Sequence, residues 1–221
     1  MTTLSPVARL KRRTGTALLI CNGEPPPRAL ARRLASRSGL IVAADGGANT
    51  ALRHGIRPHV IIGDLDSIRP ASRKLFASSL IIQVKRQDNT DLEKALDYLA
   101  ARKVREVSIL GATGRRMDFT FANLSSLWNY TSTMRIAVIG DGWYAMPVES
   151  RATVAARPGT TVSLIPFGPC SGITLRGLRY PLTDATMKVG EIGVSNVVRR
   201  SPFRVSVRKG KMFLFVMARP W

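Results

Sequence analysis

The apolar residues in the first two thirds of the chain form short, unbroken runs rather than an alternating pattern. Each run is rich in Ile, Val and Leu and ends at a polar turn. Such runs are typical of strands that are buried on both faces. We therefore predict strands over residues 17–21, 40–44, 60–62, 80–84, 107–110 and 135–139.

Helical patterns lie between several of these strands. We predict helices over residues 25–38, 90–102 and 118–129. The second has a capping box, since Thr90 is followed three residues later by Glu93. Alternating strands and helices indicate a doubly wound, mostly parallel sheet, in which ligands bind beyond the carboxyl ends of the strands.

The pattern changes after about residue 146, where helical periodicity disappears. Short β-rich runs cover residues 160–166, 173–175, 194–198, 203–207 and 212–217, and Lys209-Gly210-Lys211 is interpreted as a hairpin turn. We predict an α/β protein, with an N-terminal doubly wound, mostly parallel sheet domain (residues 1–146) and a smaller all-β sandwich domain (residues 147–221). Residues 1–15 are expected to form a loose basic arm.

Composition adds a strong positive charge. The chain has 34 Lys and Arg against 14 Asp and Glu, a formal net charge of +20. This charge favours anionic ligands such as nucleotides, nucleic acid or an anionic membrane, and does not choose among them. Two distant cysteines, Cys21 and Cys170, suggest neither a metal site nor a disulfide framework, so a cytoplasmic location is expected. No run is long enough to predict a membrane span.

Six of the 14 acidic residues fall in four short motifs that follow the predicted strands. Asp45 follows the second strand, Asp64 and Asp66 the third, Asp88 and Asp91 the fourth, and Asp118 comes after the fifth. Parallel strands bring these motifs to one edge of the sheet. Clustered carboxylates repel one another unless a cation offsets them, which indicates Mg²⁺ bound together with a phosphate substrate.

Two of the motifs also suit phosphate binding. Asp88-Asn-Thr-Asp91 opens a helix, where Thr90 can cap the helix and backbone amides can face a phosphate. Gly111-Ala-Thr-Gly-Arg-Arg-Met-Asp118 is a glycine-containing turn in which Arg115 or Arg116 can bind phosphate oxygens. The chain has neither a P-loop nor a G-x-G-x-x-G motif, so it lacks the signatures of ordinary P-loop and dinucleotide-binding proteins.

Taken together, the motifs resemble the thiamine pyrophosphokinase family. The resemblance rests on A-D-G-G-A-N, G-D-L-D-S, D-N-T-D-L-E-K-A-L and G-A-T-G-R-R-M-D-F-T-F-A-N-L, followed by S-L-I-P-F-G, G-L-R-Y-P-L and G-V-S-N, in that order. It covers roughly residues 16–217.

The resemblance implies transfer of a pyrophosphoryl group from ATP to the hydroxyl of thiamine, in a homodimer whose active site lies between subunits. It implies that Asp64, Asp66 and Asp91 hold Mg²⁺ with Asp45 nearby. ATP would be bound by Asp88, Thr90, Gly111, Arg116 and Asp118, and thiamine by Ser195 and Asn196. Phe203 is the candidate for an aromatic contact with thiamine, and Asp45 and Asp118 are both candidates for the group that orients or deprotonates the hydroxyl.

One departure from the family keeps alternatives open. Phe119 stands where the family usually has His, so a pyrophosphokinase for another small alcohol, such as a pterin, is a second hypothesis. A nucleic-acid-binding module is a third hypothesis based on charge alone, but nucleic acid is not the expected partner. That hypothesis leaves the acidic motifs unexplained, because carboxylates repel phosphates in the absence of a metal.

Overall fold

The computed structural model describes residues 3–4, 13–86, 88–191 and 193–218. The chain divides into two compact units, one formed by residues 10–141 and the other by residues 142–221 together with residues 1–9. The observed division falls a few residues before the expected one. Most of the expected basic arm lies outside the described residues, and residues 13–15 belong to a strand.

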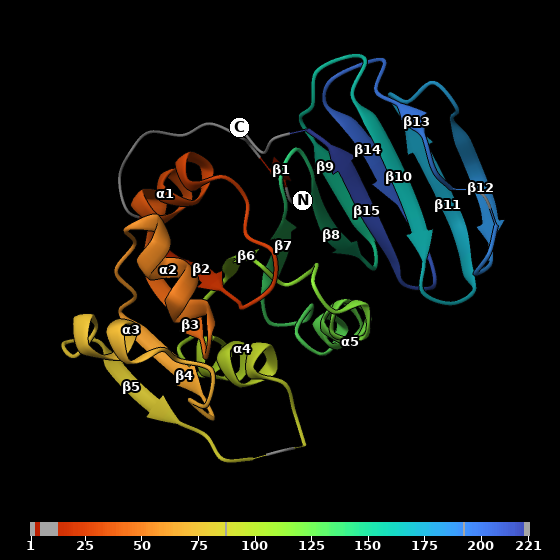
Figure 1. Cartoon of the computed structure of the whole chain (residues 1–221). Helices are drawn as coiled ribbons and strands as arrows, with labels where there is room; N and C mark the ends of the chain where they lie inside the picture. The colour runs from red at the N-terminus through yellow and green to blue at the C-terminus, as the bar shows by residue number, and fades with distance from the viewer. Residues whose placement is uncertain (1–2, 5–12, 87, 192, 219–221) are drawn as a thin grey trace. The chain divides into compact units, whose positions relative to one another are not determined.

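The first unit is built on a sheet of parallel strands, as expected (Figure 1). Its strands are β2 (Arg13–Ile20), β3 (Ser38–Ala44), β4 (Val60–Gly63), β5 (Leu80–Gln83), β6 (Glu106–Leu110) and β7 (Arg135–Ile139). Their order is β7-β6-β2-β3-β4-β5, and every adjacent pair is parallel. The order reverses beside β2, so the crevice between the ends of β2 and β6 is the expected place for a ligand.

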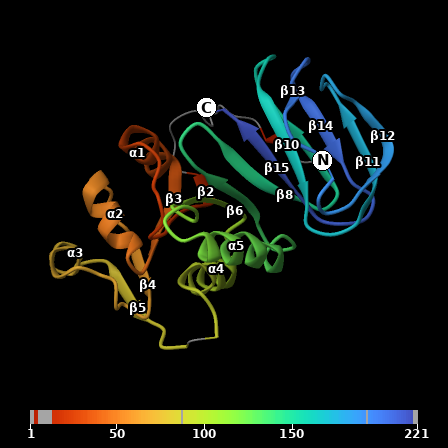
Figure 2. The same ribbon diagram turned by 45° about the vertical axis from the view of Figure 1, so that its right-hand side comes forward.

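The described residues of this unit form five α-helices. They are α1 (Arg28–Arg37), α2 (Gly47–His54), α3 (Pro70–Leu75), α4 (Asp91–Ala101) and α5 (Met117–Ser126), and a short 3₁₀ helix, η1 (Leu127–Asn129), follows α5. In both views α1, α2 and α3 follow one another along one side of the unit (Figures 1 and 2). Sequence patterns predicted α1, α4 and α5 but missed α2 and α3.

The second unit consists of two packed sheets. Its strands are β1 (Thr3–Leu4), β8 (Tyr144–Val148), β9 (Arg151–Val154), β10 (Thr161–Pro166), β11 (Cys170–Arg176), β12 (Leu182–Met187), β13 (Asn196–Val197), β14 (Phe203–Ser206) and β15 (Met212–Met217). One sheet has the order β1-β9-β14-β11-β12, and the strands β13-β10-β15-β8 pair antiparallel in the other. The expected β-sandwich is confirmed.

The Lys209-Gly210-Lys211 turn is not a hairpin turn. It joins β14 to β15, which belong to different sheets of the sandwich. Gly210 has a φ of 113°, and a Cβ atom there would lie 2.6 Å from the carbonyl oxygen of Pro169. The glycine is therefore needed for a connection between sheets. The sequence pattern could not separate this connection from a hairpin, because both place a glycine turn between two apolar runs.

Candidate active site

Three carboxylates from three separate segments meet beyond the ends of the strands. Oxygen atoms of Asp45, Asp64 and Asp91 all lie within 4.8 Å of one another. Asp45 follows β3, Asp64 follows β4, and Asp91 is the first residue of α4. We call these three residues the acidic cluster. Their convergence was predicted from the order of strands and motifs, and their oxygen ligands suit a hard cation such as Mg²⁺.

Asp45 is the most buried member of the acidic cluster. Asp45 is only 4% exposed, and its Oδ1 atom is buried without a hydrogen-bond partner among the described residues. Burial raises its pKa, and the negative charges of Asp91 and Asp64 raise it further, while a hydrogen bond from the Gly46 backbone lowers it. A buried, unpaired carboxylate oxygen is costly unless a ligand satisfies it, so the site fits a bound cation.

Gly63 allows the acidic cluster to be compact. A Cβ atom at this position would lie 2.8 Å from the Cβ atom of Asp45 and 3.1 Å from Oδ1 of Asp91. Any larger residue would therefore push the two acids apart. Gly63 is therefore required for the close approach of Asp45 and Asp91.

Lys94 belongs to the site although the sequence analysis did not select it. Its ammonium group lies 2.9 Å from Oδ1 of Asp91, and the side chain is 4% exposed. Lysine is seldom buried unless it is paired. It lies one helical turn after Asp91 on α4, and this spacing could have identified it. Lys94 offsets part of the negative charge and orients Asp91.

Asp66 does not join the acidic cluster. The resemblance implied that Asp66 helps to hold Mg²⁺, but Leu65 has a φ of 71°, which breaks the extended backbone that would place Asp64 and Asp66 on one side. Asp66 is exposed, and one of its carboxylate oxygens accepts a hydrogen bond of 2.8 Å from the hydroxyl of Ser67. In this arrangement, Asp45 takes the third position that was assigned to Asp66.

The motif before α4 has a structural role. Thr90 Oγ1 accepts a hydrogen bond from the Glu93 backbone at 3.3 Å, and Glu93 Oε2 accepts one from the Thr90 backbone at 2.9 Å. This is the predicted capping box. Asp88 is exposed and forms an ion pair of 2.7 Å with Arg86. The motif therefore fixes the start of α4 and with it the position of Asp91.

The loops after β2 and β6 lie close together where the strand order reverses. The Gly23 N–H donates to the Gly111 carbonyl at 2.7 Å, and the Glu24 N–H donates to the Thr113 carbonyl at 2.8 Å. A Cβ atom on Gly23 would lie 2.4 Å from the Gly111 carbonyl oxygen. The Gly111 loop was predicted from the sequence, but its partner, Asn22-Gly23-Glu24, carries no recognised motif and was missed.

Arg116 and Asp118 form a two-point ion pair at the start of α5. The Arg116 Nε atom lies 3.1 Å from Asp118 Oδ1, and its Nη2 atom lies 2.5 Å from Oδ2. The guanidinium also lies 4.4 Å from the ring centroid of Phe119. The hydrogen bond from Arg116 lowers the pKa of Asp118. Asp118 is therefore placed to hold the Arg116 guanidinium in position.

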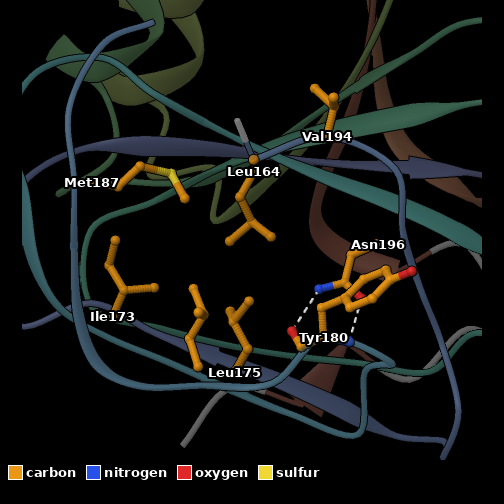
Figure 3. A pocket seen from close by; sticks show the side chains of 9 residues that line it. Leu164, Ile173, Leu175, Tyr180, Met187, Val194 and Asn196 are labelled. Atoms are coloured by element: carbon orange, nitrogen blue, oxygen red, sulfur yellow. Dashed lines mark hydrogen bonds between the residues drawn. The ribbon is translucent and has the colours of Figure 1, made fainter. Parts of the chain in front are cut away.

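The β-sandwich unit contains a small pocket with a mostly apolar lining (Figure 3). Its volume is about 120 Å³, and it is lined by Leu164, Ile173, Leu175, Tyr180, Leu182, Met187, Gly193, Val194 and Asn196. Leu164 and Ile173 are buried, whereas Tyr180 and Val194 are more than half exposed. The pocket therefore reaches from the surface into the sandwich. Because a cavity of roughly 150 Å³ accommodates benzene, this one is close to the size of a single ring.

Asn196 fixes one side of this pocket. Its amide Nδ2 donates to the Tyr180 carbonyl at 2.8 Å, and its Oδ1 accepts from the Tyr180 N–H at 3.0 Å (Figure 3). Ser195 is exposed, has a φ of 62°, and donates its backbone N–H to the Ser163 hydroxyl at 3.1 Å. Asn196 holds the chain at Tyr180 against the segment that carries Ser195.

Phe203 does not line the pocket. Its side chain is completely buried in β14, so in this structure it offers no exposed ring face to a ligand. The alternation of buried Phe203 and Val205 with exposed Arg204 is that of a strand packed on a core. We therefore assign Phe203 to the core of the sandwich.

Comparisons with known proteins agree with this architecture. The family model "Thiamin pyrophosphokinase, catalytic domain" matches residues 31–138, and "Thiamin pyrophosphokinase, vitamin B1 binding domain" matches residues 150–212. The chain is similar to Thiamine pyrophosphokinase 2 of Arabidopsis thaliana, with 30% identity over 72% of this chain and 71% of the relative. It is also similar to the thiamine pyrophosphokinase of Bacillus subtilis, with 27% identity over 79% of this chain and 86% of the relative.

The crystal structure of the Bacillus subtilis thiamine pyrophosphokinase superimposes with a TM-score of 0.80 at 25% identity, covering 92% of this chain and 99% of that one. The fold of the Candida albicans thiamin pyrophosphokinase also matches, with a TM-score of 0.82 over 92% of this chain and 88% of that one. Among the described residues, no helix is long and apolar enough to cross a membrane. The two family matches follow one another along the chain and coincide with its two units, and the chain belongs to the thiamin pyrophosphokinase family.

Proposed function

We propose that the protein transfers a pyrophosphoryl group from ATP to the hydroxyl of thiamine in a reaction that depends on Mg²⁺. The observation that carries the proposal is the acidic cluster, with its buried and unpaired Asp45 Oδ1 atom. Asp45, Asp64 and Asp91 would hold the metal ion. Bound Mg²⁺ would neutralise charge on the phosphate oxygens during transfer.

In this reaction the thiamine oxygen forms a bond to the β-phosphorus of ATP, and the bond between that phosphorus and the bridging oxygen of AMP breaks. The hydroxyl proton is released to water, and AMP departs with the bridging oxygen. The protein's own contribution is mainly to position the phosphates and to stabilise their charge. Arg116 can bind phosphate oxygens as a planar fork, with Asp118 and Phe119 fixing its orientation.

The thiamine site is proposed to lie in the β-sandwich unit, at Ser195 and at the pocket beside Asn196. Its apolar lining suits an aromatic ring, and the exposed Tyr180 side chain can contact a cationic ring through its face. The vitamin B1 binding domain model matches the same part of the chain, which supports the assignment. We also propose a homodimer and a cytoplasmic location.

The proposal is tested by incubating the purified protein with ATP and thiamine, with and without Mg²⁺. We expect AMP and thiamine diphosphate in equal amounts, detected by chromatography and mass spectrometry, only when all three components are present. ATP binding without AMP formation from thiamine would contradict the proposal.

Phe119 supports a second candidate function, in which the acceptor is another small alcohol such as a pterin. It replaces the His usual at this position in the family, and its side chain is exposed beside Arg116. The same assay with a hydroxymethyl pterin in place of thiamine separates the two functions. AMP formed with the pterin and not with thiamine would favour the second.

A further inference from the structure

Two arginines of α1 converge on the end of α2 in the first unit. Arg32 Nε donates to the carbonyl oxygen of His54 at 2.8 Å, and Arg28 Nε donates to the same oxygen at 3.2 Å. Because both donors reach one oxygen, the two guanidinium groups lie side by side. Like charges held this close repel one another unless an opposite charge is present.

The end of α2 explains only part of this arrangement. Gly55 adopts a left-handed conformation, and the N–H groups of Gly55 and Ile56 bond to the carbonyls of Leu52 and Ala51. This is a complete Schellman cap, so the helix end is already satisfied apart from its last carbonyls. The partial charge of a helix C-terminus is about half an elementary charge. Two full positive charges exceed what it can offset.

The surroundings add positive rather than negative charge. Arg53 lies on the last turn of α2 and donates to the hydroxyl of Thr50 at 2.8 Å. Burial lowers the pKa of His54, and the charges of Arg53, Arg28 and Arg32 lower it further. The three helices on this side, α1, α2 and α3, contain no Asp or Glu, and no ion pair of the described residues involves Arg28, Arg32 or Arg53.

We propose that Arg28 and Arg32, with Arg53 beside them, bind a phosphate-type oxyanion. Each guanidinium uses its Nε atom on His54 and has its terminal amino groups left for a ligand, and paired planar forks suit tetrahedral oxyanions. The Nη2 atoms of Arg28 and Arg32 both lie within 3.2 Å of the position that a Cβ atom on Gly55 would occupy. The two guanidinium groups therefore meet over this glycine, and because both arginines are exposed, the oxyanion would lie against their solvent-facing side.

This site is separate from the acidic cluster. Asp45 lies just before α2, and the arginines lie at its other end, so about 12 Å of helix separates them at 1.5 Å per residue. The oxyanion has two possible sources: a free phosphate compound, or the phosphodiester backbone of a nucleic acid. Both present the same oxygens to the arginines, and binding measurements can distinguish them.

The test uses the full chain in EDTA, so that the acidic cluster without metal repels anions. Isothermal titration with inorganic phosphate and fluorescence anisotropy with a labelled single-stranded RNA are compared for the wild type, R28Q/R32Q and the matched control R73Q/K74Q. The control removes the same charge from exposed positions on α3. We expect R28Q/R32Q to weaken binding at least tenfold, roughly the loss of one charge-assisted hydrogen bond, and the control to change it less than about threefold.

Phosphate binding that is lost in R28Q/R32Q identifies a free phosphate compound as the ligand. RNA binding without phosphate binding, lost in the same variant, identifies a phosphodiester backbone. Equal weakening in both double variants, or no binding of either probe to the wild type, overturns the proposal. R28K/R32K keeps the charge and loses the planar forks, so a folded R28K/R32K that binds at least threefold more weakly than wild type separates specific recognition from a general charge effect.

Discussion

The acidic cluster and the pocket of the β-sandwich are opposite kinds of site. The acidic cluster brings together three carboxylates, one of them buried with an unpaired oxygen. The pocket is mostly aliphatic, and both ends of the amide of its buried polar side chain, Asn196, form hydrogen bonds to the Tyr180 backbone. The carboxylates of the acidic cluster need a cation to offset their charge, whereas the polar side chain of the pocket already has hydrogen-bond partners within the protein. The difference matches the two halves of the proposed reaction, a metal-bound phosphate and an organic ring.

The largest expected effect comes from removing charge from the acidic cluster. Asp64→Asn and Asp91→Asn should each lower turnover at least ~100-fold, because transition-state charge stabilisation is lost. Asp66→Asn is the matched control, and it should lower turnover less than ~10-fold because Asp66 lies outside the cluster. Steady-state rates of AMP formation measure all three. Equal losses in Asp64→Asn and Asp66→Asn would show that the wrong third acid has been assigned.

The pocket should respond in binding rather than in turnover. Asn196→Ala removes both hydrogen bonds to the Tyr180 backbone and should raise the KM for thiamine about tenfold, with kcat and the KM for ATP changed less than ~3-fold. Tyr180→Phe is a control that leaves these backbone bonds intact and keeps the ring. A loss of kcat in Asn196→Ala at an unchanged thiamine KM would place Asn196 in the chemical step instead.

A substitution in the core of the sandwich should affect stability alone. Phe203→Leu should lower the free energy of unfolding by about 1–2 kcal/mol, since it leaves a partly filled space in a packed interior. The KM for thiamine should stay within ~2-fold of the wild-type value. Denaturant unfolding and steady-state kinetics check the two parts. A large rise in the KM for thiamine with unchanged stability would show that Phe203 contributes to thiamine binding.

The smallest expected effect concerns Phe119. Phe119→His introduces the residue usual in the family and should change kcat/KM for thiamine by less than ~5-fold, because the exposed ring contacts Arg116 from outside the ion pair with Asp118. Competition between thiamine and a hydroxymethyl pterin, followed by product analysis, measures the preference. A reversal of the preferred acceptor would make Phe119 the determinant of specificity.

The parallel sheet and the meeting of the acids could be predicted because both follow from strand order. Buried strands leave continuous apolar runs, and the rule for parallel sheets then brings their following loops together. The helix α2 was missed because it begins at Gly47, a poor helix former that is required there. A Cβ atom at this position would lie 2.0 Å from the carbonyl oxygen of Ile20.

Local backbone conformations, one exposed strand and individual side-chain contacts could not be predicted from the sequence. Asp66 lies outside the acidic cluster because of the backbone conformation of Leu65, and leucine rarely adopts a positive φ. The strand β12 was missed because most of its residues are not buried and it has no apolar run. Asn196 was selected by resemblance, but its hydrogen bonds to the Tyr180 backbone join residues 16 positions apart and become visible only in the folded structure.

The central claim is that Asp45, Asp64 and Asp91 hold a divalent cation. The most direct test is to measure binding of Mn²⁺, used in place of Mg²⁺, by electron paramagnetic resonance in the presence of a non-hydrolysable ATP analogue. We expect one bound ion in the wild type, affinity lowered at least ~10-fold in Asp45→Asn and Asp91→Asn, and nearly unchanged affinity in Asp66→Asn. Equal Mn²⁺ affinity in the wild type and in Asp91→Asn would contradict the claim.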